Sequence, residues 1–264
     1  MSTSLLRFPR RWLVAVAALL AVGQFGAAQA DATRWQFVTE QFAPYTLARG
    51  GEAAGPMVDV LRRVCEKLRV DCNVEVLPWR RALRMAERGE VEGIFTVVDT
   101  PERRAAFWLA DPVIEARYTF FARADNAFAY TAPRDLREQT IGVYGPSASS
   151  TILSGLLKEG NARMVVEVDN TTVLRKLAGG RYGDDGLAMV NEMVAREIIA
   201  HEHMTGLRAV GEASRFTYTF GLSRQRLQAA DLARFNEALT QLCRSGELQR
   251  LLDPYGMRSP SCRG

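Results

Sequence analysis

Short apolar segments alternate with amphipathic segments along the first half of the chain. Runs of five or six residues rich in valine, isoleucine and phenylalanine are typical of buried strands, whereas apolar residues every three or four positions are typical of helices. The helical spacing is clear at Val58, Leu61, Val64, Cys65 and Leu68. The pattern predicts strands at 35–39, 73–77 and 92–97, and helices at 56–68, at 79–88 before Gly89, and after a capping Thr100 followed by Pro101.

The same alternation begins again after Arg123. Strands followed by helices indicate an α/β fold, and the 264 residues leave room for two α/β units of about 100 residues each. No low-complexity segment interrupts the alternation. It predicts strands at 141–144, 164–168, 187–190 and 216–222, helices at 148–158 and 171–178, a helix ending at Ala200, and two terminal helices.

The first thirty residues have the three parts of a secretory signal peptide. Arg7, Arg10 and Arg11 give a positive start, and residues 12–23 form an apolar run too short to span a bilayer comfortably. Ala28-Gln29-Ala30 is a small-x-small cleavage site, so we expect cleavage after Ala30. A retained membrane anchor is the alternative, and the short run without charges after it argues against that.

The charge of the mature chain excludes one class of partner. The sequence has 34 Lys and Arg against 30 Asp and Glu, and the leader holds three arginines and no acid, which leaves 31 against 30. The remaining arginines are scattered along the chain. A nucleic-acid-binding protein would concentrate basic residues in a patch or stripe, so we expect no nucleic-acid partner.

Four cysteines in an exported chain indicate two disulfides. Three pairings of Cys65, Cys72, Cys243 and Cys262 are possible, and pairing sequence neighbours is the most economical. That pairing requires Cys72 to lie past the end of the first helix, because seven residues along a helix would separate the two cysteines by about 10 Å. A metal site is the alternative, which the absence of a Cys-x-x-Cys pair disfavours, and we expect no metal.

Several motifs occur in a fixed order along the mature chain. They are Phe42-Ala43-Pro44-Tyr45, Gly55-Pro56-Met57-Val58-Asp59-Val60, Gly93-Ile94-Phe95-Thr96, Thr100-Pro101-Glu102-Arg103, Asp111-Pro112 and Leu177-Ala178-Gly179-Gly180-Arg181. Each is weak alone, but in this order and spacing they resemble the family 3 bacterial solute-binding proteins, the periplasmic receptors of polar amino-acid ABC importers. The segment Pro78-Trp79-Arg80-Arg81-Ala82 is similar to a P-W-x-R-A variant within that family.

The resemblance implies a two-lobed periplasmic binding protein fold of type II, with two α/β lobes joined by two crossover strands. It places lobe 1 at about 31–119 plus 220–264 and lobe 2 at 120–219. The crossovers would lie near 118–123 and 218–221. The implied function is periplasmic capture of a small solute between the lobes by hinge closure, followed by docking of a monomer on an ABC-type permease, with no cofactor.

Arg103 is the first ligand-binding residue that the resemblance implies. A cation in the first turn of a helix is opposed by the helix dipole, by roughly 0.3–1 kcal/mol, which suggests a binding role. In the family the equivalent arginine grips the ligand carboxylate, and a planar guanidinium suits that bidentate contact. The alternative is a solvated arginine, as expected of Arg104 beside it.

Five further positions carry implied contacts. Phe42 and Trp79 fall where the family places aromatic walls around the ligand, although core packing is the ordinary role of an aromatic residue. Thr96 would offer its hydroxyl at a strand end, and Arg81 would be a second cation of the pocket or a surface ion pair. Ser147 would reach the ligand from lobe 2 or act only as a helix N-cap.

The chain departs from the family at the position that binds a ligand ammonium. An aspartate is usual there, and the matching residue in this chain is Asn191. A buried ammonium that faces only an amide is poorly compensated. Glu192 or Glu40 would have to supply the negative charge if the ligand carries an amine.

Other chemistries find less support in the sequence. His201-Glu202-His203, the only histidine cluster, follows a predicted helix and is expected to be a solvated loop away from the cleft. No G-x-S-x-G or S-x-x-K motif indicates a nucleophile, and we expect no enzymatic activity. Two alternatives stay open: a periplasmic enzyme of the cyclohexadienyl dehydratase type, with Glu40 as general acid, and a ligand-presenting partner of a membrane sensor.

Overall fold

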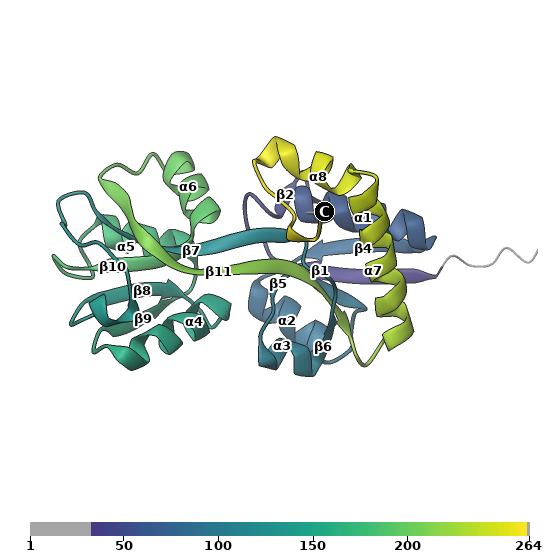
Figure 1. Cartoon of the computed structure of the whole chain (residues 1–264), viewed down its shortest axis with the longest axis horizontal. Helices are drawn as coiled ribbons and strands as arrows, with labels where there is room; N and C mark the ends of the chain where they lie inside the picture. Colours follow the sequence, from purple (N-terminus) through teal and green to yellow (C-terminus); the bar gives the residue numbers. More distant parts are fainter. Residues whose placement is uncertain (1–32, 263–264) are drawn as a thin grey trace, which may run out of the picture. The chain divides into compact units, whose positions relative to one another are not determined.

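The computed structural model describes residues 33–262. The predicted signal peptide and its cleavage site lie outside the described residues. In the described range no helix is long and apolar enough to cross a membrane. Strands and helices alternate through most of that range, which confirms the α/β class predicted from the sequence (Figure 1).

The main sheet is mixed and has two similarly built ends. At one end β4, β1 and β5 are parallel, and at the other end β9, β8 and β10 are parallel. The order is β4-β1-β5-β11-β7-β10-β8-β9, with β6 also paired to β11 and a separate β2–β3 hairpin. The strands are β1 (Arg34–Thr39), β2 (Leu47–Arg49), β3 (Glu52–Ala54), β4 (Asp71–Val76), β5 (Gly93–Val98), β6 (Phe107–Leu109), β7 (Ile114–Arg123), β8 (Thr140–Tyr144), β9 (Arg163–Glu167), β10 (Leu187–Asn191) and β11 (Leu207–Ser223).

We call the end that contains β1, β4 and β5 lobe 1, and the end that contains β8, β9 and β10 lobe 2. The antiparallel strands β7 and β11 run through both and pair from Ile114 opposite Tyr218 to Arg123 opposite Leu207 (Figure 1). The predicted lobe boundaries near 119 and 220 fall within these strands and stay predictions. The sequence analysis found only 216–222 of the 17-residue β11, because two register shifts in 207–215 break its period-2 pattern.

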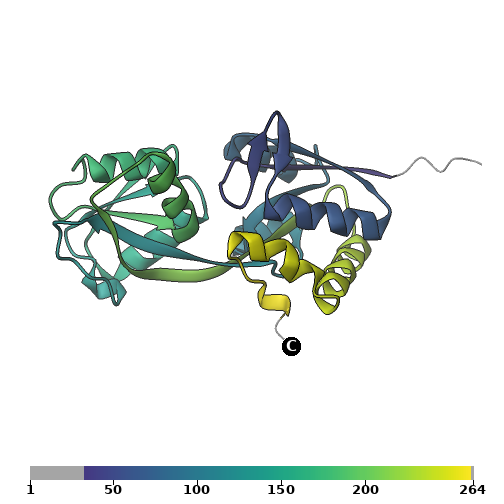
Figure 2. The ribbon, with the colours of Figure 1, turned by 90° about the horizontal axis from the view of Figure 1, so that it is seen from above.

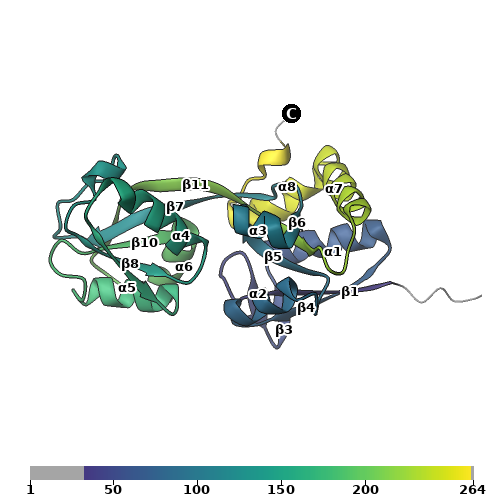
Figure 3. The same ribbon diagram turned by 90° about the horizontal axis from the view of Figure 1, so that it is seen from below.

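Helices cover both faces of the sheet in lobe 1. In β1, Phe37 belongs to the apolar cluster that includes α1 and α7, and its neighbour Val38 belongs to the cluster under α2, as the alternation of side chains along a strand requires. Figure 1 shows α1 and α8 on one side of β1 and β4 and α2 and α3 on the other, and Figures 2 and 3 show α1, α7 and α8 together. The helices are α1 (Pro56–Leu68), α2 (Trp79–Glu87), α3 (Pro101–Ala106), α4 (Ala148–Leu156), α5 (Asn170–Ala178), α6 (Glu192–His201), α7 (Ala229–Arg244) and α8 (Glu247–Leu252).

The cysteines pair locally. Cys65 lies in the last turns of α1 and bonds to Cys72 in β4, and Cys243 in α7 bonds to Cys262. Helix α1 ends at Leu68 and Arg69 adopts a left-handed conformation with φ 58°, so the chain turns back and brings Cys72 beside the helix. This is the fold-back that the spacing of the first two cysteines required.

Candidate functional site

The carboxyl ends of the six parallel strands all lead into one region. In open α/β sheets ligands bind beyond these ends, because the chain leaves each strand there in a loop that begins the next helix. Residues at or after the ends of β1, β4 and β5 supply one wall, and residues at or after the ends of β8, β9 and β10 supply the other.

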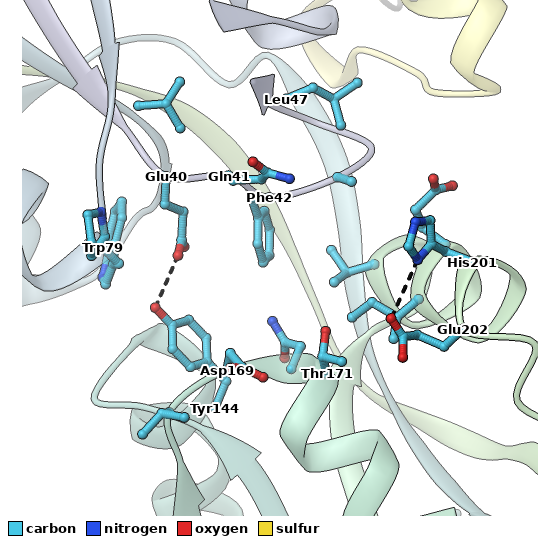
Figure 4. Close-up of a pocket in the computed structure, with 18 of the residues that line it drawn as sticks. Glu40, Gln41, Phe42, Leu47, Trp79, Tyr144, Asp169, Thr171, His201 and Glu202 are labelled. Atoms are coloured by element: carbon cyan, nitrogen blue, oxygen red, sulfur yellow. Dashed lines mark hydrogen bonds and ion pairs between the residues drawn. The ribbon is translucent and has the colours of Figure 1, made fainter. Parts of the chain in front are cut away.

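Two connected cavities lie in this region. The inner cavity encloses about 40 Å³, room for a few water molecules. A wider groove of about 810 Å³ shares Glu40, Phe42, Trp79 and Tyr144 with it (Figure 4). The inner cavity is lined by Glu40, Phe42, Trp79, Thr96, Val98, Arg103, Tyr118, Tyr144, Ser147, Ala148, Ser149, Asn170, Asn191 and Tyr218, which includes seven of the eight residues predicted to contact a ligand.

Arg103 is largely buried, with 15% of its side chain exposed. It follows the N-cap Thr100, whose hydroxyl accepts from the Arg103 amide at 3.3 Å, as the sequence predicted. Its Nη1 donates to Glu87 Oε1 at 3.0 Å, and its guanidinium lies 5.9 Å from the centre of the Trp79 ring. Burial lowers the pKa of Arg103, and Glu87 partly offsets that effect. The ion pair holds the guanidinium at the cavity wall.

Thr96 has a strained backbone. Its φ is 63°, which a β-branched residue rarely adopts. The register between β5 and β11 shifts here, because Val97 faces Thr219 and Phe95 faces Phe220, so Thr96 is the extra residue of a bulge. Bulges re-aim side chains next to binding sites, and strain of this kind persists where the surrounding structure enforces it. Here the bulge directs Thr96 into the cavity lining, 3.3 Å from the Thr46 hydroxyl.

The two predicted aromatic walls both line the cavity. Phe42 stacks on Tyr45 at 5.7 Å between ring centres and meets the edge of Tyr218 at 6.0 Å. Trp79, the first residue of α2, is only 8% exposed, and its indole Nε1 has no hydrogen-bond partner among residues 33–262. A buried donor without a partner costs free energy, so a ligand acceptor would satisfy it.

Asn191 is already engaged by the protein. It caps α6, with Oδ1 accepting from the Val194 amide at 3.1 Å and from the Tyr45 hydroxyl at 3.2 Å, while Nδ2 donates to the Tyr218 hydroxyl at 3.2 Å. The carboxamide therefore joins α6 in lobe 2 to Tyr45 in lobe 1. It leaves no negative charge for a ligand ammonium.

Glu40 is the only carboxyl group in the lining of the inner cavity. It follows β1, and its Oε2 accepts from the Tyr144 hydroxyl at the end of β8, at 3.1 Å (Figure 4). Burial raises the pKa of Glu40 from 4.5 to about 8, and the hydrogen bond from Tyr144 opposes that rise only in part. Glu40 therefore holds its proton largely bound at neutral pH.

Ser147 lies at the start of α4, and its hydroxyl donates to the Tyr144 carbonyl at 2.8 Å and lies 2.7 Å from the Ser149 hydroxyl. Thus Ser147 lines the cavity while its hydroxyl fixes the turn between β8 and α4. Ser147 occupies the N-cap position of α4, but its hydroxyl accepts no helix amide, because it is turned toward the Tyr144 carbonyl.

Arg81 and Glu192 do not join the cavity. Arg81 is exposed on α2, because two residues along a helix correspond to about 200° of rotation from the buried Trp79. Glu192 points elsewhere and pairs with Arg117 and Arg196. Of the two acids considered as partners for an amine, only Glu40 is in place.

The histidine cluster is nearer the site than expected. His201 ends α6, and with Glu202 it lines the wide groove (Figure 4). The expectation that this cluster lies away from the cleft is wrong, because α6 begins at the cavity and its far end forms the groove wall. Among the described residues no group of histidine, cysteine and acidic side chains is placed to hold a metal ion.

Sequence reasoning missed several polar residues of the lining. Tyr118 and Tyr218 belong to the crossover strands β7 and β11, so the predicted crossovers were a signal for them. Tyr144 is the last residue of β8, and Ser149 and Asn170 stand in the first turns of helices that follow parallel strands. The rule that ligands bind beyond the carboxyl ends of parallel strands would have selected these three.

The comparisons with known proteins agree with this geometry. The model of the bacterial extracellular solute-binding proteins, family 3, matches residues 37–258, so the chain belongs to that family. A comparison with curated proteins gave no match.

Solved structures share the two-lobed type II fold. The sensor domain of a histidine kinase with similarity to periplasmic binding proteins is 20% identical, with a TM-score of 0.76 over 87% of this chain and 99% of that one. An ancestral arginine-binding protein bound to arginine is 19% identical, with a TM-score of 0.72 over 84% of this chain and 97% of that one. An ancestral amino acid-binding protein, a precursor of cyclohexadienyl dehydratase, is 18% identical, with a TM-score of 0.69 over 84% of this chain and 94% of that one. At these identities the likeness concerns the fold alone.

Proposed function

We propose that this protein captures a small polar solute with both a carboxylate and an amine, an amino acid or a relative, between its two lobes. One observation carries the proposal. Among the fourteen residues that line the inner cavity, Arg103 is the only Lys or Arg and Glu40 is the only acid. One fixed cation and one acid in an otherwise uncharged cavity match the two charges of a zwitterion.

The carboxylate would bind at Arg103. The ion pair with Glu87 uses Nη1, and the other nitrogens of the guanidinium have no hydrogen-bond partner among the described residues. Trp79 Nε1 is a second donor, and Thr96 supplies a hydroxyl. Planar recognition of a carboxylate by a guanidinium, supported by neutral donors, fits this arrangement.

The amine would bind at Glu40 instead of at Asn191. Contact with an ammonium favours the ionised carboxylate, which offsets the cost of burying it. The wide groove on this side adds the carboxylates of Asp169, Glu197 and Glu202, and its lining contains no lysine or arginine. The amine would therefore face this groove.

Capture would proceed by hinge closure about β7 and β11, since these strands connect the lobes. Two hydrogen bonds join the lobes in the structure, Tyr144 to Glu40 and Tyr45 to Asn191. A solute would replace the first with its own contacts. We further propose that the protein works as a periplasmic monomer that delivers its solute to an ABC-type permease.

A thermal-shift screen of residues 31–264 tests the proposal. The panel is the twenty L-amino acids, with monocarboxylates and polyamines as single-charge controls. A ligand at a hundred times its Kd adds about 2.7 kcal/mol to the free energy of unfolding, or several degrees in Tm. A shift with amino acids that is absent from Arg103→Ala supports the proposal, and shifts with carboxylates alone would refute the role of Glu40. Silence across the panel would refute the proposal as a whole.

Glu40 also supports a second candidate, an enzyme of the cyclohexadienyl dehydratase type. A buried carboxyl group that stays protonated at neutral pH can act as a general acid, and Glu40 has that property beside Tyr144. The measurement is turnover of prephenate and arogenate by the wild type and by Glu40→Gln. Turnover that the substitution abolishes would establish the enzyme, and no turnover by the wild type would remove it.

A further inference from the structure

A second groove adjoins the inner cavity, and Glu40 is not among the residues that line it. It has a volume of about 400 Å³, and the residues that line it include three arginines, Arg80, Arg84 and Arg103, and one acid, Glu102. We call it the basic groove. Arg103, Ser147 and Ala148 line both the basic groove and the inner cavity, so the two are continuous.

The charges of the basic groove are poorly compensated within the protein. Arg80 and Arg84 stand four residues apart on α2, where like charges are neighbours and destabilise a helix. Neither guanidinium has a hydrogen-bond or ion-pair partner among residues 33–262, whereas Arg103 pairs with Glu87. Both arginines are exposed, so their guanidinium groups are available to an anion from outside the chain.

The opposite wall also favours an anion. It is the start of α4, a nine-residue helix whose first residue, Ala148, lines the groove together with Ser147 and Thr151. The first amide groups of a helix lack partners within the helix and carry the positive end of its dipole. Cations on α2 and α3 thus face a helix N-terminus across the gap between the lobes.

We propose that the solute carries a second acid group and that this group lies in the basic groove, between Arg84 and Arg80 on one side and the start of α4 on the other. This rests on the proposed function, because it places the first carboxylate at Arg103 and the amine toward Glu40. The inner cavity alone is too small for a whole solute, and the basic groove is the extension on the carboxylate side. The substrate class is a zwitterion with two acid groups, such as a dicarboxylic or a phosphorylated amino acid.

Matched ligand pairs test this inference by isothermal titration. L-glutamate and L-glutamine, and L-aspartate and L-asparagine, have nearly the same shape and differ by one acid group. In the third pair, O-phospho-L-serine and L-serine, the acidic member also adds the volume of the phosphate. We expect the acidic member of at least one pair to bind at least about tenfold more tightly, as for a charge-assisted hydrogen bond to a guanidinium. Higher salt should weaken the acidic member more than its neutral partner.

Variants connect the preference to the groove. Arg84→Gln should weaken the acidic member about tenfold and its neutral partner less than twofold, since one charge-assisted contact is lost. Arg88→Gln is the control, because Arg88 is an exposed arginine at the end of the same helix and lines neither the cavity nor the groove. Equal effects of Arg84→Gln on both members would overturn the inference.

The outcomes separate the inference from the proposed function. Binding of neutral amino acids as tightly as, or more tightly than, their acidic partners in all three pairs overturns the second acid group and leaves the proposed function standing. If only an amino acid outside these pairs binds, the second acid group is likewise overturned and the proposed function stands. Failure of every amino acid in the twenty-member screen and of O-phospho-L-serine overturns both.

Discussion

Replacing Glu40 with glutamine should change how stability depends on pH. Glutamine keeps the size of the side chain and an oxygen that can accept from the Tyr144 hydroxyl, 3.1 Å from Glu40 Oε2, but it cannot ionise. In the wild type burial raises the pKa of Glu40 from 4.5 to about 8. Between these two values the folded protein keeps a proton that the unfolded chain has released.

The sign and size follow from that difference. The contribution of Glu40 to stability is fully present below pH 4.5 and is lost as the pH rises toward 8, because the unfolded chain then gains from ionising and the folded protein does not. At about 1.4 kcal/mol per pKa unit, the upper limit of the loss is roughly 5 kcal/mol. Opening of the lobes would hydrate the carboxylate and reduce this loss. We therefore expect the wild type to lose about 2 kcal/mol of unfolding free energy through Glu40 between pH 5 and pH 8.

Urea unfolding of the empty protein at pH 5, 6, 7 and 8 measures this loss. Both proteins contain the same other titrating groups, so the difference in the free energy of unfolding between Glu40→Gln and the wild type isolates the effect of Glu40. As the pH rises, the variant should become more stable relative to the wild type. A difference that stays constant from pH 5 to pH 8 would show that Glu40 is ionised throughout and would refute the reasoning.

The same residue gives a signature on binding. An ammonium beside Glu40 lowers its pKa, so at pH 6.5 the wild type should release close to one proton when it binds an amine-bearing solute. Titration calorimetry in two buffers with different ionisation enthalpies measures that proton. The variant should release no proton. If the binding enthalpy of the wild type is the same in both buffers, the amine binds elsewhere.

Three further predictions concern other residues. Arg103→Ala should weaken solute binding at least about a hundredfold and lower the free energy of unfolding by about 1 kcal/mol. The control Arg104→Ala removes an exposed guanidinium that pairs with Asp99 and should change neither quantity. Large destabilisation of Arg103→Ala with binding intact would mean that Arg103 has a structural role. In urea unfolding Thr96→Gly should be about 1 kcal/mol more stable than Thr96→Ala, because only glycine relieves the strain at φ 63°, and both should bind solute less tightly. Joint replacement of Cys243 and Cys262 by serine should lower the free energy of unfolding by roughly 3 kcal/mol, from the 19-residue separation that the disulfide spans, in urea unfolding. Reduction of the wild type should lower it further, because it also opens the Cys65–Cys72 disulfide.

Much of the fold could be predicted because its elements are locally encoded. The helix 56–68 was found with its exact bounds, since its apolar face, its N-terminal proline and the chain reversal after Leu68 are all short-range features. The N-cap Thr100 was found for the same reason. The first part of β11 and the short strands β2, β3 and β6 were missed, because bulges and three-residue pairings leave no period in the sequence.

The sequence by itself determined which residue types are available to the site and, through motif order, where most of them belong. Only the tertiary structure decided which acid lines the inner cavity. The sequence matched the uncharged Asn191 to the family's acidic position and offered Glu192 or Glu40 as substitutes. The structure uses Asn191 as a cap, pairs Glu192 with two arginines and leaves Glu40 half-buried opposite Tyr144. The physical reason is that a charge's role depends on its burial and its neighbours, and the decisive neighbours are distant in sequence: Tyr144 lies 104 residues from Glu40, and Arg117 lies 75 residues from Glu192.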